Sequence, residues 1–325
     1  MPFKDIKGQD KPINFLQESI KQQQLAGAYL FLGPDGVGKA MAAKILAKAV
    51  NCLEAESDAC EKCSSCIKIE KNQHPDIHLI NAGNPEDDEE TGAIKIEDIR
   101  QLHREINLRP FEAKKKVFII DNAHQLTAEG ANALLKILEE PPKNSLIILI
   151  SSKFSRLFKT IISRCRIVKF STLPRKELEA TLKNEYHLLY DQAHFLAYLA
   201  EGRLGAALSL KDTDILREKN MLIDDFVAAD SSHLDHLAAK DRESLRRYLN
   251  LLAVWLRDIY LVKSGLPHAE IINLDRKEQL LKLMSHYTYS ELDEALKFVS
   301  QALLYLEQNV NAKLIFANLK GILKG

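Results

Sequence analysis

The sequence predicts an α/β fold in which a P-loop domain with a parallel sheet comes first and helical regions follow. A glycine-rich loop, Gly33–Lys39, lies between an apolar run that predicts a strand (28–32) and a segment that predicts a helix (40–50). Short apolar runs and amphipathic segments then alternate up to about residue 170, the order from which a parallel sheet is built. From about residue 213 onward, leucine and alanine recur at helical spacing, which predicts a bundle of helices.

The loop from Gly33 to Lys39 keeps the glycines and the lysine of the pattern G-x-x-x-x-G-K-[ST]. In this pattern backbone N–H groups surround the phosphates, the lysine supplies positive charge, and the Ser or Thr hydroxyl holds Mg²⁺. Position 40 is alanine here, and a methyl group cannot bind a metal. We therefore predict a degenerate P-loop that can still bind ATP or ADP but does not hydrolyse it. The predicted nucleotide-binding residues are Gly33, Gly36, Gly38, Lys39 and Asp121.

A second nucleotide-site motif follows the buried-strand pattern 117–120. Asp121 comes at the carboxyl end of this strand, where P-loop enzymes hold their Mg²⁺. Asn122 stands where related ATPases usually have a glutamate that activates water, and an amide cannot accept a proton from water. A lone Asp at a strand end can simply be solvated. Separate losses at the metal ligand and at the base nevertheless favour a degenerate ATPase.

The remaining elements of the predicted sheet alternate in the same way. The predicted strands are 74–80 and 146–150, and the predicted helices are 94–106 and 128–139. Pro141 and Pro142 stop the second helix, because proline cannot continue a helix. The second strand ends at Ser151, a position from which a polar side chain could approach a γ-phosphate.

Four of the five cysteines lie together, with the spacing C-x₇-C-x₂-C-x₂-C. They are Cys52, Cys60, Cys63 and Cys66. Two C-x₂-C pairs supply the converging thiolates that a tetrahedral Zn²⁺ needs. Oxidised or redox-active cysteines and unligated thiols are the alternatives, and the first is disfavoured in a reducing compartment. We predict structural zinc, since four thiolates leave no open coordination position for catalysis.

The composition is that of a multidomain intracellular protein. Lys+Arg and Asp+Glu number 45 each, so the formal net charge is zero, which argues against a protein that grips DNA alone through a large basic surface. The chain shows no apolar run of the roughly 18–20 residues that span a bilayer and no secretory h-region. We expect a cytoplasmic protein that contacts no membrane.

The segment 153–169 is basic and contains no acid. Within it, Ser163-Arg164-Cys165 is a short polar break between an apolar pair and a predicted strand at 167–170. A guanidinium fixed by two ordered flanks could reach a phosphate bound to a neighbouring subunit, because arginine offers a rigid fork of donors and a permanent charge. Cys165 is interpreted as a small buried residue rather than a nucleophile.

Five motifs, in this order and spacing, resemble the bacterial clamp-loader ATPases of the AAA+ class in the DNA polymerase III holoenzyme. They are Phe3-x-Asp-Ile-x-Gly-Gln9, residues 28–34, the four-cysteine insert, residues 132–142 and Ser163-Arg164-Cys165. The resemblance covers about residues 3–170. It implies an AAA+ P-loop domain at 1–172 with a zinc module at about 52–66, a small helical lid at 173–211, and an all-α C-terminal collar that joins subunits at 212–325.

Within that family, Ala40 and Asn122 point to the delta-prime branch, because the gamma/tau motor subunits retain the metal ligand and the glutamate. Gly205 stands where active members carry a second-sensor arginine. The resemblance implies a non-catalytic subunit in a hetero-oligomeric ring with gamma/tau and delta subunits, which meets the sliding clamp and primer–template DNA through the complex. Arg164, with Ser163 and Cys165 in the motif, would act in trans as an arginine finger at a neighbour's ATP site.

Two other functions stay open at this point. One is an active gamma/tau-like ATPase in which another residue replaces the missing metal ligand. The other is a zinc-dependent DNA-binding module. The insert and its flank carry more acidic residues than lysines, and a module with net negative charge binds the phosphates of DNA poorly.

Overall fold

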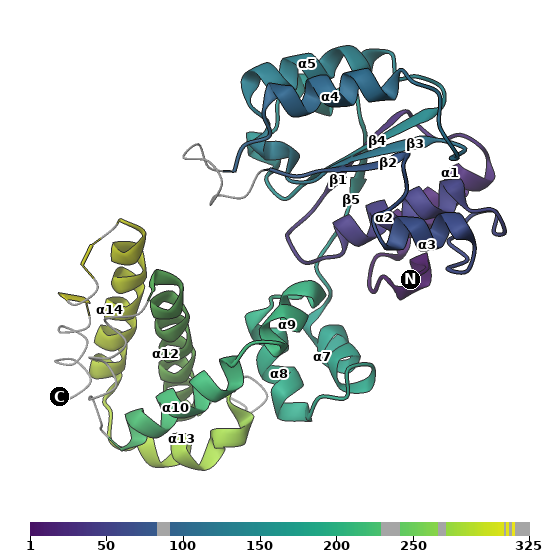
Figure 1. Ribbon diagram of the computed structural model, residues 1–325. Helices are drawn as coiled ribbons and strands as arrows, with labels where there is room; N and C mark the ends of the chain where they lie inside the picture. Colours follow the sequence, from purple (N-terminus) through teal and green to yellow (C-terminus); the bar gives the residue numbers. More distant parts are fainter. Residues whose placement is uncertain (83–91, 229–240, 266–270, 309, 312–313, 316–325) are drawn as a thin grey trace. The chain divides into compact units, whose positions relative to one another are not determined.

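The computed structural model describes residues 1–82, 92–228, 241–265, 271–308, 310–311 and 314–315 (Figure 1). The chain divides into two units. The first comprises Met1–Pro174 and Glu201–Ala206, and the second comprises Arg175–Ala200 and Ala207–Gly325.

A five-stranded parallel sheet forms the centre of the first unit, with strand order β2-β3-β4-β1-β5. Its strands are β1 (Ala28–Leu32), β2 (Ile77–Ile80), β3 (Lys116–Ile120), β4 (Ser145–Ser151) and β5 (Arg166–Lys169). The three inner strands are buried along their whole length, as expected of a parallel sheet covered on both faces. The predicted α/β P-loop class is therefore confirmed.

Helices cover both faces of this sheet (Figure 1). One layer consists of α1 (Asp10–Lys21), α2 (Lys39–Asn51) and α3 (Ser64–Glu70), and the other of α4 (Ile96–Ile106), α5 (Ala128–Glu139) and α6 (Lys159–Ile162). Successive strand residues serve opposite layers. Tyr29 and Phe31 belong to the same core cluster as Leu46 of α2, whereas Leu30 belongs to the cluster that contains Leu134 of α5.

The predicted elements agree with the structure most closely where a local end signal exists. Helix α5 has the predicted bounds, since the Thr127 hydroxyl accepts a hydrogen bond from the Gly130 N–H at 3.1 Å and two prolines follow. Helix α4 begins two residues later than the predicted Ile94. Ile94 instead forms a β-bridge with Leu126, so its backbone groups are used outside the helix.

The second unit is helical in its described parts. Its helices are α7 (Arg175–Asn184), α8 (Tyr190–Leu199), the larger part of α9 (Leu204–Lys211), α10 (Ile215–Val227), α12 (Arg242–Lys263), α13 (Lys277–Leu283) and α14 (Tyr289–Glu307). Helix α12 buries an apolar row at helical spacing: Leu245, Leu249, Leu252 and Leu256. The lid and collar boundaries stay predictions. None of the helices in the described ranges combines the length and the apolar composition that crossing a membrane requires.

Candidate functional site

The P-loop connects β1 to α2, and its lysine is turned onto the loop itself. Gly38 caps α2 with a φ of 96°, a left-handed conformation that glycine adopts without strain. The Lys39 ammonium donates to the carbonyls of Gly33 and Pro34, both at 2.6 Å, and the residue is 5% exposed. Burial lowers the pKa of Lys39, although Asp35 opposes that shift. Lys39 therefore satisfies carbonyl oxygens of its own loop.

The start of α9 packs directly on the P-loop backbone. The Gly205 N–H donates to the Gly36 carbonyl at 2.8 Å, and a Cβ on Gly205 would lie 2.9 Å from that oxygen. Gly36 itself has a φ of 79°. An arginine at 205 would force these two backbones apart, so this packing is incompatible with a second-sensor arginine at that position. Arg203, two residues earlier, forms an ion pair with Glu201 at 3.5 Å.

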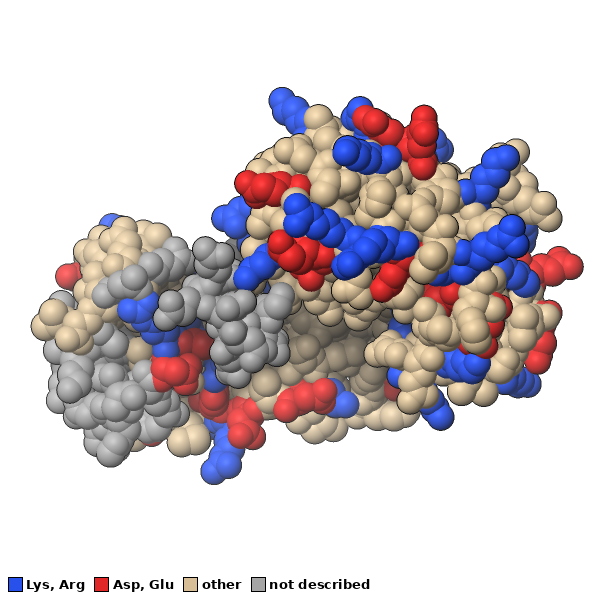
Figure 2. Space-filling view, turned by 45° about the horizontal axis from the view of Figure 1, so that its top comes forward, with Lys and Arg blue, Asp and Glu red and all other residues tan. Residues whose placement is uncertain are grey.

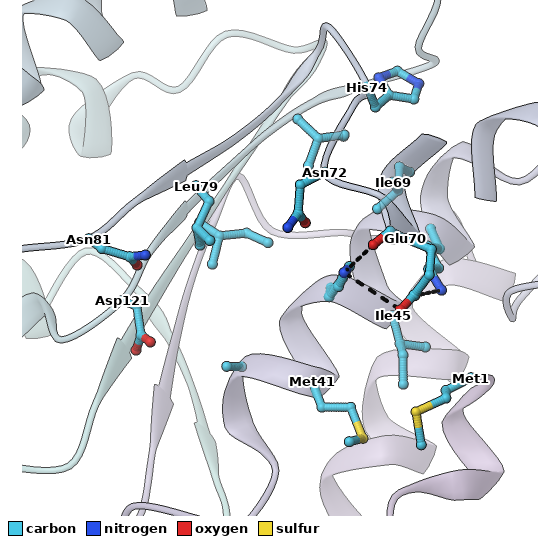
Figure 3. A pocket seen from close by; sticks show the side chains of 15 residues that line it. Met1, Met41, Ile45, Ile69, Glu70, Asn72, His74, Leu79, Asn81 and Asp121 are labelled. Atoms are coloured by element: carbon cyan, nitrogen blue, oxygen red, sulfur yellow. Dashed lines mark hydrogen bonds and ion pairs between the residues drawn. The ribbon is translucent and has the colours of Figure 1, made fainter. Parts of the chain in front are cut away.

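Asp121 and Ala40 line one pocket of about 580 Å³ beside helix α2 (Figure 3). Asp121 and Asn81 lie next to each other at the ends of β3 and β2, and the Asp121 N–H donates to the Ile80 carbonyl at 2.9 Å. Mg²⁺ requires an octahedron of oxygen ligands. Of the two positions where P-loop enzymes hold the metal, only Asp121 offers an oxygen, so this side of the site fits Mg²⁺ poorly.

The position of the expected catalytic base has a constrained backbone. Asn122 has φ 52° and ψ 43°, in the left-handed region, which asparagine tolerates better than most residues. A glutamate at position 122 would supply the missing base, but its backbone would have to adopt this strained left-handed conformation. Asn122 N–H donates to the Asp121 carboxylate at 2.8 Å.

His124 has a contact that no pattern in the sequence indicated. Its Nδ1 lies 3.2 Å from the hydroxyl of Ser151 at the end of β4. The same hydroxyl accepts a hydrogen bond from Lys153 N–H at 3.2 Å, and Ser151 is 1% exposed. Burial, together with Lys153, lowers the pKa of His124. The Ser151 hydroxyl, predicted to approach a γ-phosphate, is therefore occupied within the chain.

The four predicted zinc ligands converge. Cys52, Cys60, Cys63 and Cys66 bring their sulfur atoms within 4.8 Å of one another. The Cys60 and Cys66 sulfurs are 4.0 Å apart, close to the roughly 3.8 Å between sulfurs around tetrahedral zinc with Zn–S near 2.3 Å. All four are free thiols rather than disulfides. Burial disfavours the Cys52 thiolate, but backbone N–H donors outweigh it and lower its pKa to about 7. The donor set fits Zn²⁺.

A buried lysine joins this cysteine module to the P-loop helix. Lys48 of α2 is fully buried, and its ammonium contacts Glu61 at 2.8 Å and also Glu70. Burial opposes the charge of Lys48, but the two carboxylates outweigh it and raise its pKa. Two of the acids that the sequence places in and beside the module thus have a structural partner. The sequence showed no sign of this, because a lysine on a helix is usually solvated.

Arg164 lies in the turn between α6 and β5 with its fork engaged. Its Nε and Nη2 donate to one carboxylate oxygen of Glu139, at 3.0 and 2.7 Å. Its Nη1 donates to the Thr160 carbonyl and to the Ser163 hydroxyl, at 3.1 and 3.2 Å. The side chain is 34% exposed. Burial raises the pKa of Cys165 to about 12, which agrees with a structural thiol and not with a nucleophile.

Some basic residues of the first unit are engaged within the chain. Three consecutive lysines at the start of β3 donate to backbone carbonyls: Lys114 to Cys52, Lys115 to Lys143 and Lys116 to Glu105. On the face shown in Figure 2, acidic side chains are interspersed with basic ones. Neither observation supports a broad basic surface of the kind that binds a nucleic-acid backbone.

Two family models of the same kind of subunit match the first half of the chain and most of its C-terminal part. The family model "DNA polymerase III, delta subunit" matches residues 8–174, and "DNA polymerase III, delta subunit, C terminal" matches residues 218–319. DNA polymerase III subunit delta' of Bacillus subtilis is 41% identical over 174 residues, 54% of this chain and 51% of that protein. DNA polymerase III subunit gamma/tau of Mycoplasma pneumoniae is 37% identical over 215 residues, 65% of this chain and 30% of that protein.

The chain thus spans about half or less of the length of these relatives. Among solved structures, a DNA polymerase III gamma subunit-related protein from Thermotoga maritima matches with a TM-score of 0.42 and 18% identity. That match covers 95% of this chain and 98% of the other.

Proposed function

Because this chain belongs to the DNA polymerase III delta-subunit family of clamp-loader proteins, we propose that it is a delta-prime-type subunit that hydrolyses no ATP itself. The observation that carries this proposal is that Ala40, in place of the hydroxyl ligand, and Asp121 line the same pocket next to α2. A P-loop site without its hydroxyl ligand loses one of the groups that hold Mg²⁺ on the β- and γ-phosphates. Without that ion, charge on the transferred phosphoryl group is not neutralised.

Two further features support a silent site. Asn122 supplies no base, and the Gly36–Gly205 backbone contact leaves no space for a sensor arginine. The three features affect metal binding, water activation and γ-phosphate contact separately. Restoring any one of them would leave the other two missing.

The subunit's contribution to ATP hydrolysis would come through Arg164. In the proposed ring, gamma/tau subunits bind ATP, and one of their sites borders this chain. Arg164 would reach that site in trans, where a guanidinium stabilises charge on the transferred γ-phosphoryl group. Zinc at the four cysteines would be structural. The complex, including delta, would load the sliding clamp on primer–template DNA.

The proposal is tested by ATP turnover measured in two settings. We expect the isolated chain to hydrolyse no more ATP than its Lys39→Ala variant. In a complex with gamma/tau and delta subunits, clamp and primed DNA, Lys39→Ala should support nearly wild-type hydrolysis. Fluorescent-nucleotide titration of both proteins separates binding from turnover.

An active gamma/tau-like ATPase is the second candidate. It is favoured by the retained Lys39 and by the gamma/tau relative, which covers more of this chain than the delta-prime relative does. ATP turnover by the isolated chain that disappears in Lys39→Ala would support this candidate and contradict the silent subunit.

A further inference from the structure

The ion pair between Arg164 and Glu139 occupies the group that the proposed function needs at a neighbouring site. Every guanidinium nitrogen of Arg164 donates within the chain: Nε and Nη2 to Glu139, and Nη1 to Thr160 and Ser163. A guanidinium engaged in this way has its charge balanced at short range by a carboxylate. It must exchange at least part of these contacts before it can bind a phosphate.

Glu139 lies at a helix position that does not favour a negative charge. It is the last residue of α5, where the helix dipole disfavours an anion. Pro141 and Pro142 follow after Glu140, so the helix cannot extend past this point. The carboxylate is therefore held beside the α6–β5 turn, and Arg164 is the cation that balances it.

The Arg164 backbone is fixed as well. Its N–H donates to the Ile161 carbonyl at 3.1 Å, and β5 begins two residues later, paired with β1. The exchange of partners is thus confined to the side chain. Both side chains are open to solvent, at 34% and 53% exposure, and such ion pairs are weak enough to be displaced.

We propose that Glu139 is the resting partner of Arg164 and makes its engagement conditional on a γ-phosphate in the neighbouring site. This inference rests on the proposed trans function of Arg164. A γ-phosphate carries more negative charge and more acceptor oxygens than one carboxylate, so it displaces Glu139. When the neighbour holds ADP or no nucleotide, the carboxylate retains the guanidinium. Glu139 is in this sense a positioning residue that acts through Arg164.

The experiment compares reconstituted complexes that differ only in this chain. Glu139→Gln keeps the size of the side chain and removes its charge. Glu140→Gln is the matched control, because it removes the same charge one residue further along. We expect Glu139→Gln to lower the ATP concentration for half-maximal hydrolysis by about two- to fivefold, the change expected for losing one exposed ion pair. The maximal rate should stay close to wild type, and Glu140→Gln should behave as wild type.

Two further variants separate this inference from the function on which it rests. The double variant Glu139→Gln/Arg164→Ala should match Arg164→Ala alone, because Glu139 acts only through the arginine. An unchanged or higher half-maximal ATP concentration for Glu139→Gln, with Arg164→Ala impaired, overturns the resting-partner role and leaves the finger intact. Full hydrolysis with Arg164→Ala overturns both. A changed unfolding temperature of Glu139→Gln without a shifted ATP dependence would identify a structural ion pair and also overturn the proposal.

Discussion

Arg164→Ala is expected to separate the folding of this chain from its contribution to ATP hydrolysis. In the folded chain, the substitution removes the ion pair with Glu139 and the surface hydrogen bonds to Thr160 and Ser163. An exposed ion pair contributes about 0.2–1 kcal/mol. The free energy of unfolding should therefore fall by no more than about 1 kcal/mol, and zinc content should not change.

The expected loss in catalysis is much larger. Arginine fingers of GTPases contribute a factor of about 10³–10⁵ in rate, which corresponds to roughly 4–7 kcal/mol of transition-state stabilisation at the one site. The expected loss of transition-state stabilisation thus exceeds the expected loss in the free energy of unfolding by at least about 3 kcal/mol. Arg164→Lys should restore little, because an ammonium lacks the planar fork.

The assay is ATP hydrolysis and clamp loading by the complex of this chain with gamma/tau and delta subunits. Size-exclusion chromatography first establishes that Arg164→Ala enters the complex. Rapid-quench measurement of the first turnover sums all ATP sites of the complex, so loss at the one site that borders this chain should appear as a slow or missing fraction of the amplitude. Wild-type first-turnover kinetics in a fully assembled Arg164→Ala complex would refute the trans role and leave the subunit as a scaffold.

Three other predictions concern stability. Metal analysis should find about one Zn²⁺ per chain, and Cys63→Ser should lower the unfolding temperature; a metal-free protein with unchanged stability would contradict the zinc site. Lys48→Met should lower the free energy of unfolding, measured with urea, by about 1–3 kcal/mol. This is less than the loss expected when a deeply buried ion pair is broken, because Glu61 and Glu70 are partly exposed and can be hydrated again. Burial opposes ionisation of Asp76, but hydrogen bonds from three backbone N–H groups outweigh it and lower its pKa. The contribution of the Asp76 carboxylate to stability is therefore complete above the unfolded pKa of about 3.9 and is lost as the pH falls through the lower folded pKa. Asp76→Asn should thus be less stable than wild type at pH 7, and its stability should fall less steeply as the solution is acidified.

The sequence predicted the features that depend on local pattern. The strand 28–32, the helix 128–139 and the convergence of four cysteines follow from apolar runs, capping residues and spacing, and each is confirmed. Contacts between distant segments left no such sign. The hydrogen bonds that the backbone N–H groups of residues 111–113 donate to Asp76 join positions more than thirty residues apart. The packing of Gly205 on Gly36 depends on how a later helix returns to the loop. A period or a motif reports on neighbours in sequence, so it cannot identify the partner of a buried charge.

A silent nucleotide site leaves the P-loop with contacts inside its own unit, and these contacts lie at the opposite end of the sheet from Arg164. Lys39 satisfies the carbonyls at the end of β1, and Gly36 receives the N–H of Gly205. β1 in turn pairs with β5, with Leu30 opposite Ile167, three residues after Arg164. Because the two strands are parallel, the loop follows the carboxyl end of β1, whereas Arg164 precedes the amino end of β5. Under the proposed function, Lys39→Ala therefore removes contacts at the carboxyl end of β1 and leaves the turn that holds Arg164 in place, which is why the complex should keep nearly wild-type hydrolysis.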